Sequence, residues 1–262
     1  MGIVNVTDDS YFADSRCPSV ASALERVKTM LDEGADVIDV GGCSTRPGAR
    51  MLDPQEEWMR LEPVLRAVKE NFPDVKLSVD TCWSFVVRNA YELIGDFIVN
   101  DISAGEDDPL MLETVGTLGL EYIAMHKRGN PENMQDLTDY KSVVEDVAGY
   151  FKDFSKRAAS KGVLRWVLDP GFGFAKTIDQ NYRMLHGLRT FKDVACGDGS
   201  EPRILVGVSR KSMIYRKFNI SPDEALPATQ VLHLAALQNG ADILRVHDVA
   251  EARRTVELYR LL

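Results

Sequence analysis

Eight short apolar runs recur along the 262 residues, each separated from the next by a longer stretch with helical periodicity. The runs are Gly2–Val6, Val37–Val40, Lys76–Val79, Phe97–Val99, Tyr122–Met125, Trp166–Leu168, Ile204–Val208 and Ile243–Val246. Because they are predominantly apolar and do not alternate strictly with polar residues, they are typical of parallel strands buried on both faces. This alternation predicts an α/β fold.

The stretches between the runs have the spacing of amphipathic helices. Ser19–Glu33 gathers apolar side chains on one helical face, and Lys141–Lys161 does the same. Asp53 is expected to cap a helix that begins at Pro54. Gly34 and Gly162 are expected to end two other helices in the left-handed conformation.

Eight such units predict one closed (β/α)8 TIM barrel, a single domain over residues 1–262. An open doubly wound sheet would carry a glycine-rich turn after its first strand, whereas Asn5-Val6-Thr7-Asp8-Asp9 stands there. No linker rich in Pro, Gly or Ser divides the chain.

Composition excludes several classes of protein. A net charge of -9 argues against a general nucleic-acid or acidic-membrane binder, which needs a positive surface. The sequence has neither a signal peptide nor a run of about 18 apolar residues. Four cysteines without a CxxC pair favour reduced thiols. We therefore expect a cytoplasmic protein with small-molecule substrates.

Polar side chains follow nearly every predicted strand. They are Asn5 and Thr7, then Ser44 and Thr45, Asp80, Asn100 and Asp101, His126 after Met125, Asp169, Ser209 to Lys211, and Arg245 with His247. TIM-barrel enzymes carry their active sites at the C-terminal ends of the strands. A lone Asp there is as often a helix N-cap, but the whole set predicts a site.

The members of this set sort by chemistry. Asp80, Asn100 and Asp169 suit the donor edge of a flat nitrogen heterocycle, since a carboxylate pairs bidentately with a guanidine-like N–H fork. Arg245 and His247 flank Val246, so both side chains point to one side of an extended segment. With Asn5 and Thr45, these two are suited to hold an anionic leaving group, together with a metal ion.

The motifs, in order, resemble those of the dihydropteroate synthase family over essentially the whole chain. They are GIVNVTDDSYF, GGCSTRPGA, SVDT, NDIS, MH, DPGFGFAKT, GVSRKSMI and LRVHDV. DPGFGFAKT does not fit a Walker phosphate loop, because Pro170 and Ala175 stand where glycines are needed. The resemblance implies a folate-pathway transferase that joins 6-hydroxymethyl-7,8-dihydropterin diphosphate to 4-aminobenzoate and releases diphosphate.

The resemblance also implies residue roles. Asp80, Asn100, Asp169 and Lys211 would hold the pterin, with Met125 nearby. Arg245, His247, Asn5 and Thr45 would bind the diphosphate, with Mg²⁺ at Asn5. Thr45, Pro47, Phe174 and Ser212 would shape the aminobenzoate pocket, and Arg46 either stabilises the closed loop or is solvated. The implied catalytic residues are Asp80, Asp169, Lys211, Arg245 and His247. The resemblance further implies a dissociative, SN1-like reaction, a homodimer and a sulfonamide target.

The chain departs from the family pattern in its first loop. Asp8 stands where the family usually has Pro, and Tyr11-Phe12 reverses the usual order, so contacts of this loop with aminobenzoate are open. The segment that usually precedes the first strand is not found. Two alternatives remain, a corrinoid-type pterin-dependent methyltransferase and a paralogue that binds pterin without turnover. Diphosphate release would separate them.

Overall fold

The computed structural model describes residues 1–6, 19–43, 51–130 and 133–262. Its strands form one eight-stranded parallel sheet in which each strand pairs with the next along the chain. They are β1 Gly2–Asn5, β2 Ile38–Gly41, β3 Leu77–Asp80, β4 Ile98–Asp101, β5 Glu121–Met125, β6 Trp166–Asp169, β7 Arg203–Val206 and β8 Ile243–Leu244.

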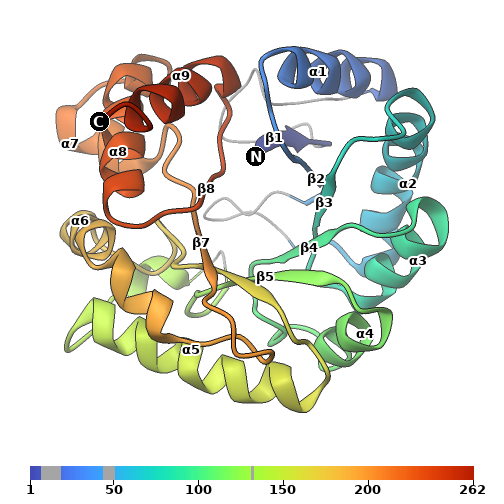
Figure 1. Ribbon diagram of the computed structural model, residues 1–262, viewed down its shortest axis with the longest axis horizontal. Helices are drawn as coiled ribbons and strands as arrows, with labels where there is room; N and C mark the ends of the chain where they lie inside the picture. The colour runs from blue at the N-terminus through green and yellow to red at the C-terminus, as the bar shows by residue number, and fades with distance from the viewer. Residues whose placement is uncertain (7–18, 44–50, 131–132) are drawn as a thin grey trace.

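The sheet closes on itself next to β8. Val246 forms a parallel bridge with Gly2. The backbone N–H of Ile3 donates to the carbonyl of Val246 at 3.0 Å, and the N–H of Val246 donates to the carbonyl of Met1 at 2.9 Å. The predicted TIM barrel is therefore confirmed, with strands around a centre and helices outside (Figure 1).

Helices α1 to α6 each lie between two consecutive strands, α7 and α8 together separate β7 from β8, and α9 follows β8. The α-helices are α1 Val20–Asp32, α2 Pro54–Asn71, α3 Ser84–Ile94, α4 Met111–Leu118, α5 Val143–Ser160, α6 Ile178–His186, α7 Ser212–Phe218, α8 Leu226–Gln238 and α9 Val249–Tyr259. Short 3₁₀ turns are η2 Met134–Asp136, η3 Leu188–Asp193 and η4 Asp223–Ala225.

The predicted helix signals are present. The Asp53 side chain caps α2 by accepting from the backbone N–H groups of Gln55 and Glu56. Gly34 and Gly162 have φ values of 93° and 82°, the left-handed conformation that ends α1 and α5. In the described part of the chain, Cys43, Cys82 and Cys196 are free thiols, and no helix is long and apolar enough to cross a membrane.

Two apolar clusters divide the core. The larger one fills the space between the strands and the helices. The smaller one comprises Ile98, Ile123, Val167 and Leu205 from four neighbouring strands. Because residues two apart in a strand face the same way, each strand that carries this cluster points its next inward residue into the same interior. In β4, β5 and β6 those residues are Asn100, Met125 and Asp169, so the barrel has an apolar floor below a polar layer.

Three predicted strands extend past the observed strand ends, and one of them is β1, which ends at Asn5 whereas the predicted run continues to Val6. β7 ends at Val206 and β8 at Leu244, whereas the apolar runs continue to Val208 and Val246. The reason is pairing, because only Ile243 and Leu244 match residues of β7 in register. Beyond that point the segment turns toward β1 and makes the closing bridge.

Gly171, just beyond β6, should tolerate no side chain. Its φ is 72°, and an added Cβ would lie 2.0 Å from the His126 carbonyl oxygen. Gly119 has a similar φ of 68° and open space around it. Both Gly→Ala changes incur about 1–2 kcal/mol of left-handed strain. Only Gly171→Ala adds a clash with the backbone. In urea unfolding, we therefore expect Gly171→Ala to lower the free energy of unfolding by about 2 kcal/mol more than Gly119→Ala does. Equal losses would contradict the observed packing.

Candidate active site

An ion-paired cluster occupies the polar layer of the barrel. Arg245, just beyond β8, places its Nη2 2.6 Å from Asp39 Oδ2 and 2.8 Å from Asp80 Oδ2. Its Nε also donates to Asp39 Oδ2 at 2.7 Å. Asn100 on β4 donates to the same Asp39 oxygen at 3.1 Å. One guanidinium therefore joins β2, β3 and β8 across the barrel.

Burial governs the electrostatics of this cluster. Removal from water raises the pKa of Asp80, while Arg245 acts in the opposite direction. Burial alone would lower the pKa of Arg245, but Asp39 and Asp80 together raise it above its ordinary value. The guanidinium is thus a permanent cation held between two carboxyl groups.

Asp39 is a member of this cluster that the sequence interpretation missed. It lies in the middle of β2 with no exposed surface, and the strand-end rule considers only residues that follow a strand. A signal was nevertheless present, because an acid inside the apolar run Val37–Val40 is costly unless it is paired. The structure supplies that partner as Arg245.

Asp169 and Lys211 form the opposite side of the polar layer. The Asp169 Oδ1 atom accepts a hydrogen bond from the backbone N–H of Gly171 at 2.8 Å. Burial raises the pKa of Asp169, and Lys211 is the strongest influence against that rise. Burial likewise lowers the pKa of Lys211 to about 8, with Asp169 opposing. Each charge therefore favours the ionised form of the other.

The Lys211 ammonium is held against the loop between β6 and α6. Its Nζ donates to the Phe172 carbonyl oxygen and lies 4.9 Å from the centre of the Phe174 ring. This is cation–π distance. Ser212, the next residue, begins α7. Lys211, Phe174 and Ser212, all predicted from the sequence, thus lie close together.

The remaining predicted residues lie around this layer. Met125 ends β5, is buried, and is the register partner of Asp169. Asn5 ends β1 opposite Gly41 of β2. The backbone N–H of His247 donates to Ser209 Oγ at 3.3 Å. Burial and nearby Arg245 lower the pKa of His247 to about 3, so its imidazole is neutral near pH 7.

Thr45, Arg46 and Pro47 lie outside the described residues, as does Asp8, so their predicted roles stay predictions. Thr7, also predicted at a strand end, falls in the same category. The described stem of the second loop ends at Gly42 and Cys43, directly beyond β2.

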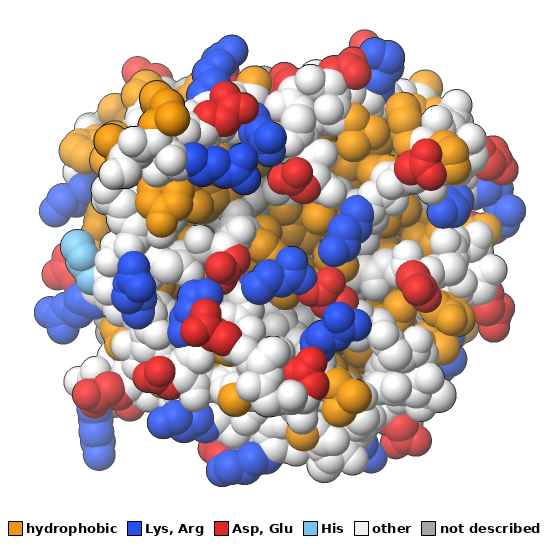
Figure 2. All heavy atoms as spheres, in the orientation of Figure 1, with side chains coloured by type: hydrophobic (Ala, Val, Ile, Leu, Met, Phe, Trp, Pro, Cys, Tyr) orange, Lys and Arg blue, Asp and Glu red, His pale blue; other side chains and the backbone are white. Residues whose placement is uncertain are grey.

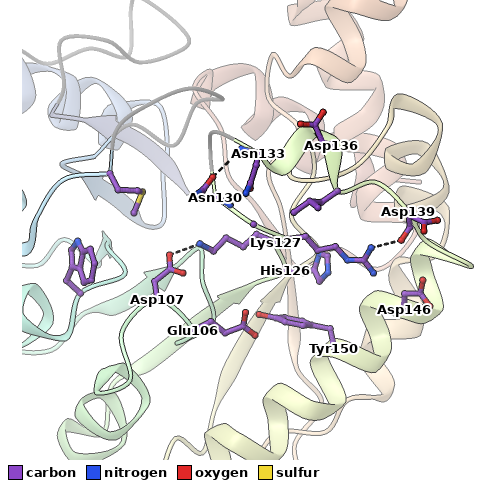
Figure 3. A pocket seen from close by; sticks show the side chains of 15 residues that line it. Glu106, Asp107, His126, Lys127, Asn130, Asn133, Asp136, Asp139, Asp146 and Tyr150 are labelled. Carbon is purple, nitrogen blue, oxygen red and sulfur yellow. Dashed lines mark hydrogen bonds and ion pairs between the residues drawn. The ribbon is translucent and has the colours of Figure 1, made fainter.

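A separate cleft of about 1170 Å³ lies beside the barrel mouth. Figure 3 shows its wall, formed by the loops after β4 and β5 and by the start of α5. Its charges are largely paired, as Lys127 Nζ lies 2.5 Å from Asp107 and Arg128 Nη1 donates to the Asp139 carbonyl at 2.6 Å. Among the described residues, none of the predicted substrate-binding set lines it. This cleft is therefore not the pocket that the charged set defines.

The donor set for a metal is limited. Within the described ranges, no group of three or more His, Cys, Asp or Glu side chains is arranged to hold a metal ion. Asn5 offers an amide oxygen, a donor type that Mg²⁺ accepts. Mg²⁺ commonly takes one or two protein groups and completes its shell with water and substrate phosphate oxygens. The residues present fit that arrangement and do not fit an all-protein metal cage.

The ion pair of Asp39 should stabilise the fold measurably. Asp39→Asn leaves the shape unchanged but removes the charge that faces Arg245. We expect the free energy of unfolding in urea to fall by about 2–4 kcal/mol, because a buried cation loses a partner. Asp53→Asn makes the same chemical change at a helix cap, where Asn serves nearly as well, and should cost less than about 0.5 kcal/mol. Similar small losses for both would mean that the contact between Asp39 and Arg245 does not stabilise the fold.

The sequence of this chain is similar to those of known proteins of one family. The sequence profile of the pterin binding enzymes matches residues 1–247. Dihydropteroate synthase of Escherichia coli strain K12 is 39% identical over 264 residues, covering 100% of this chain and 89% of the relative.

Solved structures agree with the sequence comparison. A Yersinia pestis dihydropteroate synthase in a sulfonamide drug complex superimposes with a TM-score of 0.92 at 36% identity, covering 99% of this chain and 92% of that one. The Burkholderia cenocepacia enzyme complexed with 7,8-dihydropteroate gives 0.86 at 35% identity, covering 99% and 89%. The Thermus thermophilus enzyme in complex with 4-aminobenzoate gives 0.85 at 32% identity, covering 100% and 93%. The chain belongs to the pterin-binding enzyme family, in the group of the dihydropteroate synthases.

Proposed function

We propose that this protein joins 6-hydroxymethyl-7,8-dihydropterin diphosphate to 4-aminobenzoate, forming 7,8-dihydropteroate and diphosphate. The observation that carries the proposal is the meeting of Asp80, Asn100, Asp169, Lys211 and Arg245 inside one barrel mouth. Relatives with 7,8-dihydropteroate or 4-aminobenzoate bound share this fold at 32–35% identity.

The pterin ring would lie on the polar layer. Its 2-amino group and neighbouring ring N–H present a donor fork that suits the carboxylate of Asp169. Asn100 and Asp80 would bind the remaining polar edge, and Lys211 would donate to an accepting ring atom. Because these groups are buried, a ligand lacking the matching donors would leave charges unpaired and bind poorly.

The diphosphate would lie at the mouth, above Arg245. Its negative charge would meet this guanidinium, the neutral His247 ring as a hydrogen-bond donor, and Asn5. Thr45 completes this set in the proposal. Mg²⁺ would be held by Asn5 and by the diphosphate oxygens, where it would supply charge neutralisation of the leaving group.

The reaction we infer is dissociative. Breaking the C–O bond leaves an electron pair on the diphosphate and positive charge on the pterin methylene carbon. Arg245 faces the growing negative charge, which is the preorganised arrangement that lowers such barriers. The amine of 4-aminobenzoate then attacks the methylene carbon and loses its proton to water or diphosphate. A neutral aryl amine is nucleophilic enough that no strong protein base is required.

The arylamine would lie against the outer side of this layer. Phe174 and Ser212 would form one wall, and Thr45 and Pro47 the other. A sulfonamide drug carries an aniline like that of 4-aminobenzoate, so we infer that such drugs compete for this subsite. The Yersinia pestis relative, solved as a sulfonamide drug complex, supports this inference.

Release of diphosphate from the pterin diphosphate, with and without 4-aminobenzoate, tests the function. We expect release to yield 7,8-dihydropteroate when both substrates are present. Asp169→Asn should lower kcat/KM by roughly 10²–10³-fold, because the ring loses a charged acceptor. Asp198→Asn, at an exposed loop position, should leave it unchanged. Turnover that required a methyl donor would replace this function by methyl transfer. Pterin binding without any turnover would indicate a non-catalytic paralogue.

We also propose that a second copy of the chain covers the surface over α7 and α8. Figure 2 shows hydrophobic side chains gathered there. Phe218 at the end of α7 is 60% exposed, and Val231 on α8 is 66% exposed. Water contact at such large apolar groups is unfavourable unless a partner covers them. This face lies on the outside of the barrel, away from the polar layer.

Light scattering of the purified protein tests the homodimer. We expect the mass of two chains, and we expect Val231→Glu to shift it toward one chain by placing a charge in the contact. Glu25→Lys on α1 is an exposed charge change on another helix and should leave the mass unchanged. A monomeric unmodified protein at micromolar concentration would exclude the dimer.

A further inference from the structure

Lys176 is a buried cation that the sequence motifs left without a role. It is the penultimate residue of the segment DPGFGFAKT, two positions before α6 begins, and only 4% of its surface is exposed. A lysine in a phosphate loop would point toward solvent or ligand. Lys176 instead points into the protein, which raises the question of what its charge does there.

Three acceptors surround the Lys176 ammonium. Its Nζ donates to the Gly171 carbonyl at 3.0 Å and to the Phe174 carbonyl at 2.9 Å. The third atom is His126 Nδ1, at 3.0 Å. Burial and the nearby charge of Lys176 lower the pKa of His126, so its ring is neutral and this nitrogen can accept. An ammonium has three N–H donors, and each one has an acceptor here.

The loop that Lys176 holds has an unusual backbone. Gly171, Gly173 and Ala175 all have positive φ, of 72°, 81° and 50°. Within this turn, the carbonyl oxygens of Gly171 and Phe174 both accept hydrogen bonds from the Lys176 ammonium. Ala175 in addition is a non-glycine residue in a strained region. The two hydrogen bonds from Lys176 to carbonyls of this turn offset the cost of that strained conformation.

This same loop presents several groups to the candidate active site. The Phe172 carbonyl accepts from Lys211, and the Phe174 ring lies beside the same ammonium. Gly171 is also held by a second hydrogen bond, because its N–H donates to the Asp169 carboxylate. Phe174 depends more heavily on Lys176. Its backbone N–H donates to the Gly171 carbonyl at 3.1 Å, and its own carbonyl accepts from Lys176.

The charge of Lys176 also acts on the polar layer. Burial lowers the pKa of Lys176 to about 7, and Asp169 is the main influence against that fall. Three accepting atoms around its Nζ favour the protonated form as well. Lys176 in turn is among the cations that oppose the raised pKa of Asp169.

We propose that Lys176 is a positioning residue, which clamps the β6–α6 loop so that Phe174 and the Phe172 carbonyl face Lys211 and form the wall of the arylamine subsite. It touches neither substrate. The proposal rests on the proposed function for the identity of the second substrate, and on the contacts above for the clamp itself.

Lys176→Met tests it, because Met has a similar length and removes the charge and all three hydrogen bonds. We expect the KM for 4-aminobenzoate to rise about tenfold, while the KM for the pterin diphosphate changes less than about threefold. Lys192→Met is the matched control. Lys192 also loses ion pairs, to Asp242 and Glu201, but it lies near the start of β7, far along the barrel from the polar layer.

Hydrogen exchange gives a readout that does not depend on turnover. Amide exchange at Gly171, Gly173 and Phe174 should accelerate by about tenfold in Lys176→Met and stay unchanged in Lys192→Met. If the unmodified protein releases no diphosphate, the proposed function fails. Amide hydrogen exchange alone then tests whether Lys176 clamps the β6–α6 loop. If Lys176→Met does not fold, His126→Phe removes one acceptor and should raise the 4-aminobenzoate KM about threefold.

Two results would overturn the proposal. One is unchanged exchange at the loop amides in a folded Lys176→Met protein, or in His126→Phe where the first variant does not fold. The other is a change in the 4-aminobenzoate KM no larger than that of Lys192→Met, in a protein that turns over both substrates.

Discussion

The bond between Arg245 and its two carboxylates is the constraint on which the candidate site depends. A guanidinium or a carboxylate alone inside a barrel would lose several kcal/mol of hydration without compensation. Asp39, Asp80 and Arg245 can be buried because each is within 2.8 Å of an opposite charge. The chain brings them together from positions 39, 80 and 245, so the site exists only in the closed barrel.

The barrel supplies two surfaces with different tasks. Ile98, Ile123, Val167 and Leu205 form an apolar floor that resists water and fixes the strands. Two residues further along the strands, the inward-facing side chains are charged or carry amide groups instead of being apolar. A flat, polar ring can lie on that layer with its hydrogen bonds satisfied, while its reactive arm points out toward Arg245 and the loops. The geometry thus separates recognition of the ring from handling of the leaving group.

Sequence reasoning reached the fold and part of the site, for identifiable physical reasons. Asp80, Asn100, Asp169 and Arg245 were predictable because parallel strands must bring the residues that follow them to one end. Asp39 was missed because it lies within a strand, where burial rather than position reveals its role. Lys176 was missed because its acceptors are backbone carbonyls and His126, and backbone acceptors have no sequence pattern. The end of β8 depends on closure with β1, a contact between residues more than 240 positions apart.

A crystal structure of the protein with the pterin diphosphate bound tests the central claim most directly. We predict that the pterin ring lies in the barrel mouth, with its donor edge on Asp169 and Asn100 and its diphosphate beside Arg245. A ring bound elsewhere, such as the cleft lined by Lys127 and Tyr150, with the ion pair of Arg245 and Asp39 untouched by ligand, would contradict it.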